Sequence, residues 1–186
     1  MATKRLFIAA EPPHHIIEGC RDLIEGLKTA GDGIRWVKSH GIHLTMKFFG
    51  DVDESRIPQI NDAAEIITGI GSIDLSVEGL GTFPGGQRPR VIWVGISGDL
   101  DRIVTARDTL DGALSGIGFP REDRPFRGHL TLGRVKGRVP VALAARLEES
   151  RNVSLGEMRV EGFSLIQSDL KPSGAVYTTL AFYPLT

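Results

Sequence analysis

The chain has 186 residues, of which 41% are hydrophobic and 24% are charged, and its formal net charge is −1. These values are typical of one soluble globular domain, and they argue against binding of long nucleic acid by overall electrostatic attraction. Cys20 is the only cysteine, which excludes an internal disulfide and suits a reducing cytoplasm. The first apolar run is too short for a signal peptide or a membrane span, so we expect no membrane association.

Apolar periodicity predicts two successive series of strands and helices. In chain order, the first series is a strand at 5–10, a helix at 13–30, strands at 34–37 and 42–49, a helix at 54–68 and a strand at 73–80. A loop rich in glycine and proline, residues 83–90, follows. The second series is a strand at 90–96, a helix at 99–117, a strand at 126–135, a helix at 140–149 and strands at 157–168 and 175–185.

The tripeptide His-Leu-Thr occurs twice, beginning at His43 and at His129, which are 86 residues apart. Random placement of the 5 histidines predicts only about 0.03 copies of this tripeptide. The surrounding elements repeat as well, because Ile8 and Val94 each lie 35 residues before their motif. We therefore predict one bilobal domain over residues 1–186, with halves at roughly 1–84 and 90–186 related by an approximate twofold axis. Helices should cover the outer sheet faces, in an α+β or mixed α/β architecture.

Each motif places one imidazole and one hydroxyl on the same face of its strand. Residues i and i+2 of a strand share a face, so His43 and Thr45 lie together, about 6–7 Å apart along the strand. His129 and Thr131 repeat this arrangement, and the intervening leucine enters the core in each copy. If the twofold axis brings the strands together across a cleft, all four side chains converge.

Two imidazoles and two hydroxyls around one small volume suit hydrolysis of a phosphodiester. The reaction needs an acid and a base on opposite sides of phosphorus, and histidine can fill either role near neutral pH. Threonine hydroxyls can hydrogen-bond the non-bridging phosphate oxygens. No carboxylate recurs at matching positions of the two motifs, so we expect no metal and no cofactor. The pattern leaves open which histidine is the base.

Five stretches of the chain carry a resemblance to a known family: "RLFIA", "RWVKSHGIHLTMKFFGDV", "GTFPGGQRPRVIWVGI", "FRGHLTLGRV" and "SDLKPSGAVYTTLAFYPL". They resemble the LigT-like RNA 2′,3′-cyclic phosphodiesterases, also called 2′-5′ RNA ligases, of the two-histidine phosphoesterase superfamily. The resemblance implies an α+β, internally duplicated, bilobal fold. In this fold two antiparallel-rich sheets line a central cleft, and the helices lie on the outer faces.

The resemblance also implies roles for the motif residues. His43 would be the proton donor and His129 the proton acceptor, while Thr45 and Thr131 would hold the phosphate. The implied reaction opens a terminal RNA 2′,3′-cyclic phosphate to a 2′-phosphate. One departure is Gly128, where family members often carry proline; this change could loosen the entry to the strand but removes no reacting group.

Four further residues are candidates for substrate binding. Arg134 follows the second motif, as it often does in the family, although strict alternation points it away from that motif. Lys47 shares the face of the first motif by the same alternation. Phe7 and Trp93 occupy equivalent repeat positions and could stack on a nucleobase, with packing in the core as the alternative. Residues 119–139 carry a net charge of +4, which suggests an anion site near the second motif.

The main prediction is a metal-independent cyclic phosphodiesterase that acts on RNA ends. Three alternatives stay open. They are hydrolysis of a small cyclic nucleotide or ADP-ribose cyclic phosphate, 2′-5′ joining of RNA ends by the same site, and a non-catalytic nucleotide- or RNA-binding module. The expected partners are RNA ends or small cyclic-phosphate nucleotides, with no membrane and no obligate protein partner.

Overall fold

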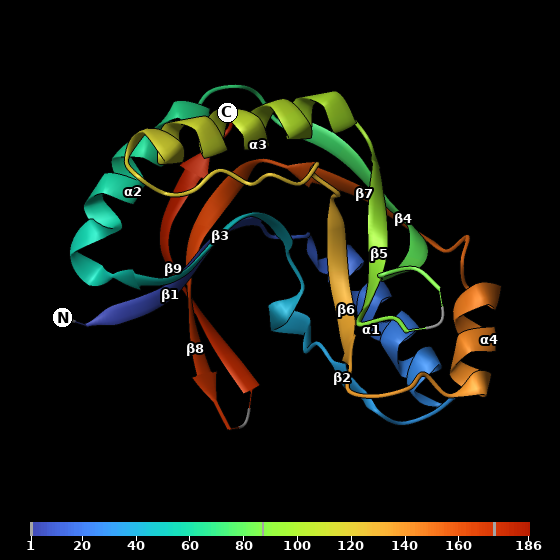
Figure 1. Cartoon of the computed structure of the whole chain (residues 1–186). Coiled ribbons are helices and arrows are strands. Elements are labelled where there is room, and N and C mark those ends of the chain that lie inside the picture. The colour runs from blue at the N-terminus through green and yellow to red at the C-terminus, as the bar shows by residue number, and fades with distance from the viewer. Residues whose placement is uncertain (1, 87, 173) are drawn as a thin grey trace.

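The fold is built on one curled sheet with helices on its outer face (Figure 1). The computed structural model describes residues 2–86, 88–172 and 174–186. Within these ranges the strands are β1 (Thr3–Ala10), β2 (Ile34–Trp36), β3 (Leu44–Asp53), β4 (Ile73–Phe83), β5 (Val91–Gly98), β6 (His129–Val135), β7 (Ser154–Val160), β8 (Gly162–Lys171) and β9 (Gly174–Pro184). The helices are α1 (His14–Lys28), α2 (Ile57–Ala64), α3 (Leu100–Gly116) and α4 (Val141–Glu149), with short 3₁₀ turns η1 (Ser39–Gly41), η2 (Glu54–Arg56) and η3 (Glu65–Ile67).

The strands form two groups that meet at one residue pair. Their order is β7-β4-β5-β6-β3-β1-β8-β9, and β2 pairs with β6. In the described part of the chain, β3 and β6 pair only through Leu44 and Leu130, so this pair joins two antiparallel groups. The predicted antiparallel α+β architecture with outer helices is confirmed, and the two predicted sheets are joined into one.

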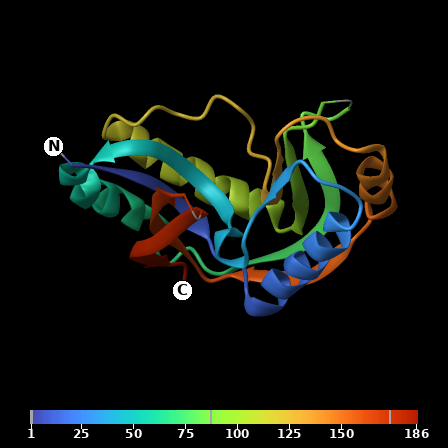
Figure 2. The same ribbon diagram turned by 90° about the horizontal axis from the view of Figure 1, so that it is seen from below.

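Each lobe contains segments from both halves of the sequence. Helix α1 follows β1 in the chain but packs against β7, and α3 follows β5 but reaches β3. Figure 2 shows α1 (blue) and α4 (orange) together at one end of the molecule and α2 (teal) at the other. The two halves of the sequence therefore exchange segments, and the junction between β3 and β6 lies between lobes that both halves build.

The predicted strand at 157–168 is wrong in one respect, because two strands occupy this region. The chain leaves β7 at Val160 and enters β8 at Gly162, and these strands lie in opposite lobes. Gly162 passes so close to β9 that a Cβ there would overlap the Phe182 ring. The alternating pattern at 157–168 therefore reads as one strand, although the chain crosses between the lobes at Glu161.

The core forms where the apolar faces of the helices meet the sheet. Ile16, Cys20, Ile24 and Leu27 are the buried residues of α1, at the helical spacing that the sequence predicts. Burying one such aliphatic side chain contributes about 1.5–3 kcal/mol, so this face alone holds α1 firmly on the sheet. Among the described helices, none combines the length and apolar character needed to cross a membrane.

Candidate active site

The site lies where the two motif strands meet at the junction of the lobes. Leu44 pairs with Leu130, and these two leucines are also 86 residues apart, the offset of the sequence repeat. Two equivalent residues can pair with each other only at the twofold axis that relates the repeats. The axis of the duplication therefore passes between the two His-Leu-Thr motifs.

The four motif side chains surround this axis. Leu44 and Leu130 are fully buried in the core, so the residues on either side of each leucine point to the opposite, concave face. Only Leu44 and Leu130 pair between these strands in the described part of the chain, and continuing the antiparallel register by one residue on each side would set His43 opposite Thr131 and Thr45 opposite His129. Residues directly opposite each other have Cα atoms about 4.5–5.5 Å apart, so the arrangement can hold one tetrahedral phosphorus centre.

An aromatic ring supports each imidazole. The Phe7 ring stacks on His43 with centroids 4.5 Å apart, and Phe83 meets His129 edge-on at 5.1 Å. Trp93 lies 6.3 Å from His129 and packs against Phe83 at 4.8 Å. Phe7 is only 3% exposed, so the prediction that it stacks on a nucleobase is wrong. The His43 imidazole covers one face of the Phe7 ring. Trp93 is only partly buried, so stacking of a nucleobase on Trp93 stays a prediction.

A hydrogen bond defines the protonation pattern of His129. The Nδ1 atom lies 2.7 Å from the carbonyl oxygen of Arg127. A carbonyl only accepts, so we assign the proton to Nδ1, and Nε2 of the neutral ring keeps its lone pair. At Gly128, between Arg127 and His129, the chain passes close to β5, because a Cβ there would overlap the side chain of Ile96. This tautomer leaves Nε2 as the His129 nitrogen that is available to other groups.

The environment of His43 disfavours its charged form. Burial, then the positive charge of Arg134 and electrostatic repulsion from the His129 imidazole when it is protonated, lower the pKa of His43 from 6.5 to about 4. Arg134 and His129 are the electrostatic causes of this shift. In the unliganded protein His43 is therefore neutral at pH 7.

The pKa of His43 predicts a pH dependence of stability. In the unfolded chain the imidazole takes up a proton near pH 6.5, whereas in the folded chain it resists protonation down to about pH 4. The free energy of unfolding should therefore fall as pH drops through this window, by about 3 kcal/mol in total. Urea unfolding at several pH values measures the loss. His43→Gln should flatten the curve between pH 6.5 and 4, and an unchanged slope in this variant would contradict the assignment.

Two equivalent bulges decide which other side chains reach the cleft. Pairing of β1 with β3 skips Met46, because Ala9 pairs with Thr45 and Ile8 with Lys47. Pairing of β5 with β6 likewise skips Leu132. These two residues are again 86 apart, so the bulge belongs to the duplicated unit. A bulge shifts the alternation by one residue, so positions beyond each motif exchange faces.

The bulge at Leu132 turns Arg134 towards the cleft. Beyond the bulge, Val91 pairs with Arg134 and Ile92 with Gly133. Ile92 is fully buried in the core, so Arg134 points to the concave face together with the motif. Strict alternation predicts the opposite direction, and the bulge reverses it.

The bulge at Met46 has the opposite consequence for Lys47. Lys47 pairs with the core residue Ile8 and is 3% exposed. Its Nζ donates to Asp111 Oδ1 on α3 at 2.5 Å and to the carbonyl oxygen of Pro120 at 2.6 Å. The prediction that Lys47 shares the face of His43 and binds substrate is wrong, because the bulge turns it into the interface with α3.

This buried ion pair gives a prediction about stability. Lys47→Met leaves Asp111 charged and unpaired in the interior, and breaking such a pair costs about 3–5 kcal/mol. The double variant Lys47→Met, Asp111→Leu should be less destabilised than the single variant, because it leaves no unpaired charge. Urea denaturation of both variants measures the difference. If Lys47→Met instead raised KM with little loss of stability, Lys47 would bind substrate as the sequence predicted.

Sequence reasoning missed Phe48, which lies at the position equivalent to Arg134 in the other half of the cleft. The offset of 86 residues links the two positions, and both follow a bulge. Phe48 pairs with Phe7 and is 46% exposed, an unusual value for a large aromatic side chain. The Arg5 guanidinium lies 4.8 Å from its ring centroid. The repeat offset could have found this residue from the sequence once Arg134 was singled out.

The basic segment at 119–139 does not gather in one place. Arg121 and Arg124 line a hollow beside α3 together with four acidic residues, Asp108, Asp111, Glu122 and Asp123. This mixture of charges does not favour an anion. Of this segment, Arg134 is the cation whose charge acts on His43. Of the predicted anion site, Arg134 on the concave face of β6 is therefore the part that remains.

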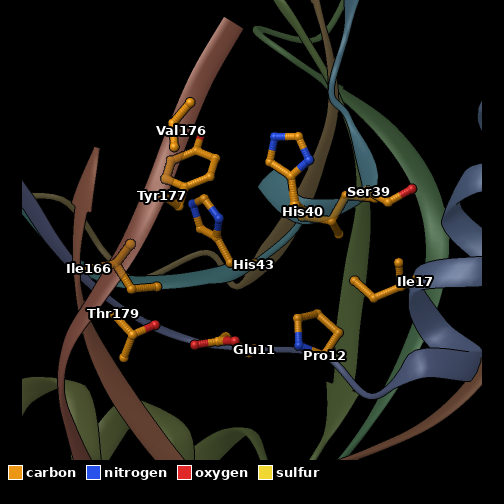
Figure 3. A pocket seen from close by; sticks show the side chains of 11 residues that line it. Glu11, Pro12, Ile17, Ser39, His40, His43, Ile166, Val176, Tyr177 and Thr179 are labelled. Atoms are coloured by element: carbon orange, nitrogen blue, oxygen red, sulfur yellow. The ribbon is translucent and has the colours of Figure 1, made fainter. Parts of the chain in front are cut away.

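A cavity of about 610 Å³ opens beside His43 (Figure 3). Tyr177 and Val176 of β9 form one wall, and His40 of η1 and Ile17 of α1 form the opposite wall. The Tyr177 ring meets the His43 ring edge-on at 5.7 Å. The residues that line the cavity include His43 but not His129, so the cavity extends the cleft to one side only.

Both halves of the chain match one known protein family. The family described as LigT like phosphoesterase matches twice, at residues 11–93 and 94–177. A Methanothermobacter thermautotrophicus protein named RNA 2′,3′-cyclic phosphodiesterase is 35% identical, over 97% of this chain and 98% of its own length. An Archaeoglobus fulgidus protein of the same name is 33% identical, over 96% and 99%.

Solved structures show the same fold. A Thermus thermophilus protein has a TM-score of 0.84 and 27% identity, over 97% of each chain. Escherichia coli LigT, complexed with 3′-AMP, has a TM-score of 0.79 and 23% identity, over 100% of this chain and 99% of the other. With two family matches, a repeated motif at the twofold axis and relatives aligned over nearly their full length, the chain belongs to the LigT-like phosphoesterase family.

Proposed function

We propose that the protein hydrolyses the terminal 2′,3′-cyclic phosphate of RNA to a 2′-phosphate. The observation that carries this proposal is the pairing of Leu44 with Leu130, which sets two His-x-Thr motifs around one axis. The relatives named RNA 2′,3′-cyclic phosphodiesterase support the substrate class. The concave face offers two proton-transfer groups and an arginine, which are the groups that opening of a cyclic phosphodiester requires.

In the proposed mechanism, water attacks phosphorus opposite the ribose O3′. His129 Nε2 takes a proton from the water as the new P–O bond forms, and its Nδ1–H remains bonded to the Arg127 carbonyl. His43 gives a proton to O3′ as the P–O3′ bond breaks, which leaves a 2′-phosphate. Thr45, Thr131 and Arg134 hold the non-bridging oxygens, whose negative charge grows in the transition state.

His43 must gain its proton when substrate binds, because in the free protein its pKa is about 4. The bound phosphate brings negative charge next to Arg134 and offsets the repulsion that lowers this pKa. An opposite charge within about 4–6 Å favours the charged form of an ionisable group. The substrate therefore helps to create the acid that acts on it. Since both proton transfers use imidazole, we propose that the step needs no metal.

Turnover of a short RNA with a 2′,3′-cyclic phosphate, in the presence of EDTA, tests the proposal. We expect conversion to a 2′-phosphate, which product analysis against 2′- and 3′-phosphate standards distinguishes. Binding without conversion would identify a nucleotide- or RNA-binding module instead. Loss of conversion with EDTA, restored by a divalent cation, would contradict metal independence.

Phe48 gives a prediction about the nucleobase. Its half-exposed ring lies on the concave face opposite Arg134 across the pseudo-twofold axis, so we propose that the terminal base stacks on it. Stacking of one base contributes about 1–3 kcal/mol, so Phe48→Ala should raise KM by about 5- to 150-fold. Steady-state kinetics measures this, with Phe182→Ala as the control because Phe182 is a similarly exposed phenylalanine on β9. Equal kinetics for both variants would remove Phe48 from the site.

The single cysteine bears on where the enzyme works. Cys20 is fully buried in α1, and burial raises the pKa of its thiol to about 12. Such a thiol is inert towards oxidation and exchange, so it suggests no redox role. We propose that the protein works in the reducing cytoplasm, where RNA ends are processed.

A further inference from the structure

The cavity beside His43 is not used by the reaction as described, which concerns only one phosphorus centre. Its volume of about 610 Å³ falls in the range of about 300–1,000 Å³ that holds small-molecule ligands. His43 is the motif residue that lines it, and His129 is not among its lining residues. Its position relative to the two histidines therefore indicates which part of a substrate it can receive.

The direction of the reaction places the RNA chain on the side of this cavity. In the proposed mechanism the water enters beside His129 and the leaving O3′ lies beside His43. Both ester oxygens of a 2′,3′-cyclic phosphate belong to the same ribose, so that ribose also lies on the His43 side. The rest of the RNA continues from the 5′ oxygen of this ribose. The cavity is thus on the path of the nucleotide that precedes the reacting end.

The walls of the cavity suit a nucleoside. Pro12, Ile17 and Ile166 give apolar surfaces, and Tyr177 gives an aromatic wall for a base. His40 adds a second ring, 6.1 Å from Tyr177, and its Nε2 lies 3.3 Å from the carbonyl oxygen of Ala175 on β9. These rings lie on η1 and β9, so both edges of the cavity are fixed by the fold.

A second cation lies next to Arg134 on the concave face. Arg35 of β2 pairs directly with Arg134 of β6, and its neighbours Ile34 and Trp36 pack towards the core. Arg35 therefore shares the face of Arg134. Neither has a carboxylate within ion-pair distance in the described ranges, although like charges directly opposite each other are destabilising. Both charges act on Tyr177, where they oppose the effect of burial, which raises the pKa of its hydroxyl.

Two adjacent arginines fit two adjacent phosphates of one RNA strand. The charge of Arg134 acts on His43, and the charges of Arg134 and Arg35 both act on Tyr177, which lines the cavity. We propose that the cavity beside His43 binds the penultimate nucleoside of the RNA and that Arg35 binds the phosphodiester that joins it to the reacting end. This subsite rests on the proposed function and extends it, because it makes an RNA end a better substrate than a cyclic mononucleotide.

Kinetics on two substrates of different length tests the subsite. The substrates are adenosine 2′,3′-cyclic phosphate and the dinucleotide ApA that ends in a 2′,3′-cyclic phosphate. One charge-assisted contact and one stacked base predict that kcat/KM is about 10- to 100-fold higher for the dinucleotide. Arg35→Gln should lower kcat/KM for the dinucleotide about 10-fold more than for the mononucleotide.

Two neighbouring threonines of β9 supply a matched pair of variants. Thr179 lines the cavity, whereas Thr178 does not and alternation points it to the opposite face. Both are exposed, so Thr179→Glu and Thr178→Glu add the same charge at the same edge strand. Thr179→Glu should reduce the dinucleotide to nearly the efficiency of the mononucleotide, and Thr178→Glu should keep the preference.

The outcomes separate the subsite from the reaction itself. Equal efficiency of the unaltered protein on both substrates, or equal effects of the two glutamate variants, would overturn the subsite and leave the proposed function standing. Conversion of neither substrate would overturn the proposed function and the subsite with it. A dinucleotide preference that Thr179→Glu removes and Thr178→Glu retains supports both.

Discussion

His43→Ala and His129→Ala are each expected to lower kcat for a cyclic-phosphate RNA end by about 10²–10⁴-fold, the usual contribution of a general acid or base. His129→Ala removes the Nε2 lone pair that the Arg127 carbonyl orients. His43→Ala removes the proton source for O3′ and the ring that stacks on Phe7. Single-turnover kinetics measures the chemical step without product release.

The double variant and a remote histidine complete this test. Because acid and base act in one concerted step, the double variant should lose far less than the product of the two single losses. His14→Ala is the matched control, since its side chain is 85% exposed on α1. If either single variant kept the kcat of the unaltered protein, that histidine would have no part in the proton transfers.

The repeated tripeptide is short, but it predicts where the site lies. The recurrence of His-Leu-Thr at an offset of 86 residues predicted a twofold axis, and Leu44 and Leu130, which share that offset, pair with each other. Local periodicity also predicted each helix, because apolar spacing depends on the chain's own neighbours. A motif's face in its own strand is likewise a local property, which is why the two leucines enter the core as predicted.

Properties that depend on a partner strand could not be predicted in this way. Whether β3 skips Met46, or β6 skips Leu132, is decided by register with the neighbouring strand. That single shift moved Arg134 towards the cleft and Lys47 away from it. The exchange of segments between the lobes has the same origin, because α1 and α3 cover faces formed by strands distant in sequence.

The two bulges also place different side chains of the duplicated halves on the concave face. A common backbone presents position 48 in one half and position 134 in the other to the same concave face. One position carries Phe48 and the other Arg134, so the symmetric frame holds an apolar platform on one side and a cation on the other. The twofold axis supplies paired histidines, and in the proposed mechanism this difference would orient the substrate between them.

Arg134→Gln should lower kcat/KM by about 10²–10³-fold, the usual loss when one stabilising donor is removed from a developing oxyanion. The variant should also raise the pKa of His43 above its value of about 4, because burial and the Arg134 charge are the leading causes of that low value. NMR titration of the imidazole measures this shift independently of activity. Arg134→Lys keeps the positive charge but loses the planar guanidinium. The pKa of His43 should therefore stay close to that of the unaltered protein, whereas kcat/KM should still be reduced.

Arg138→Gln is the matched control for Arg134→Gln, because it removes the same charge from an exposed position in the loop after β6. It should leave both kcat/KM and the His43 titration close to those of the unaltered protein. If the two glutamine variants behaved alike, the effect would come from net charge and not from a contact with phosphate. If Arg134→Gln changed the rate but not the pKa of His43, Arg134 would lie too far from the imidazole for both groups to serve one phosphorus centre.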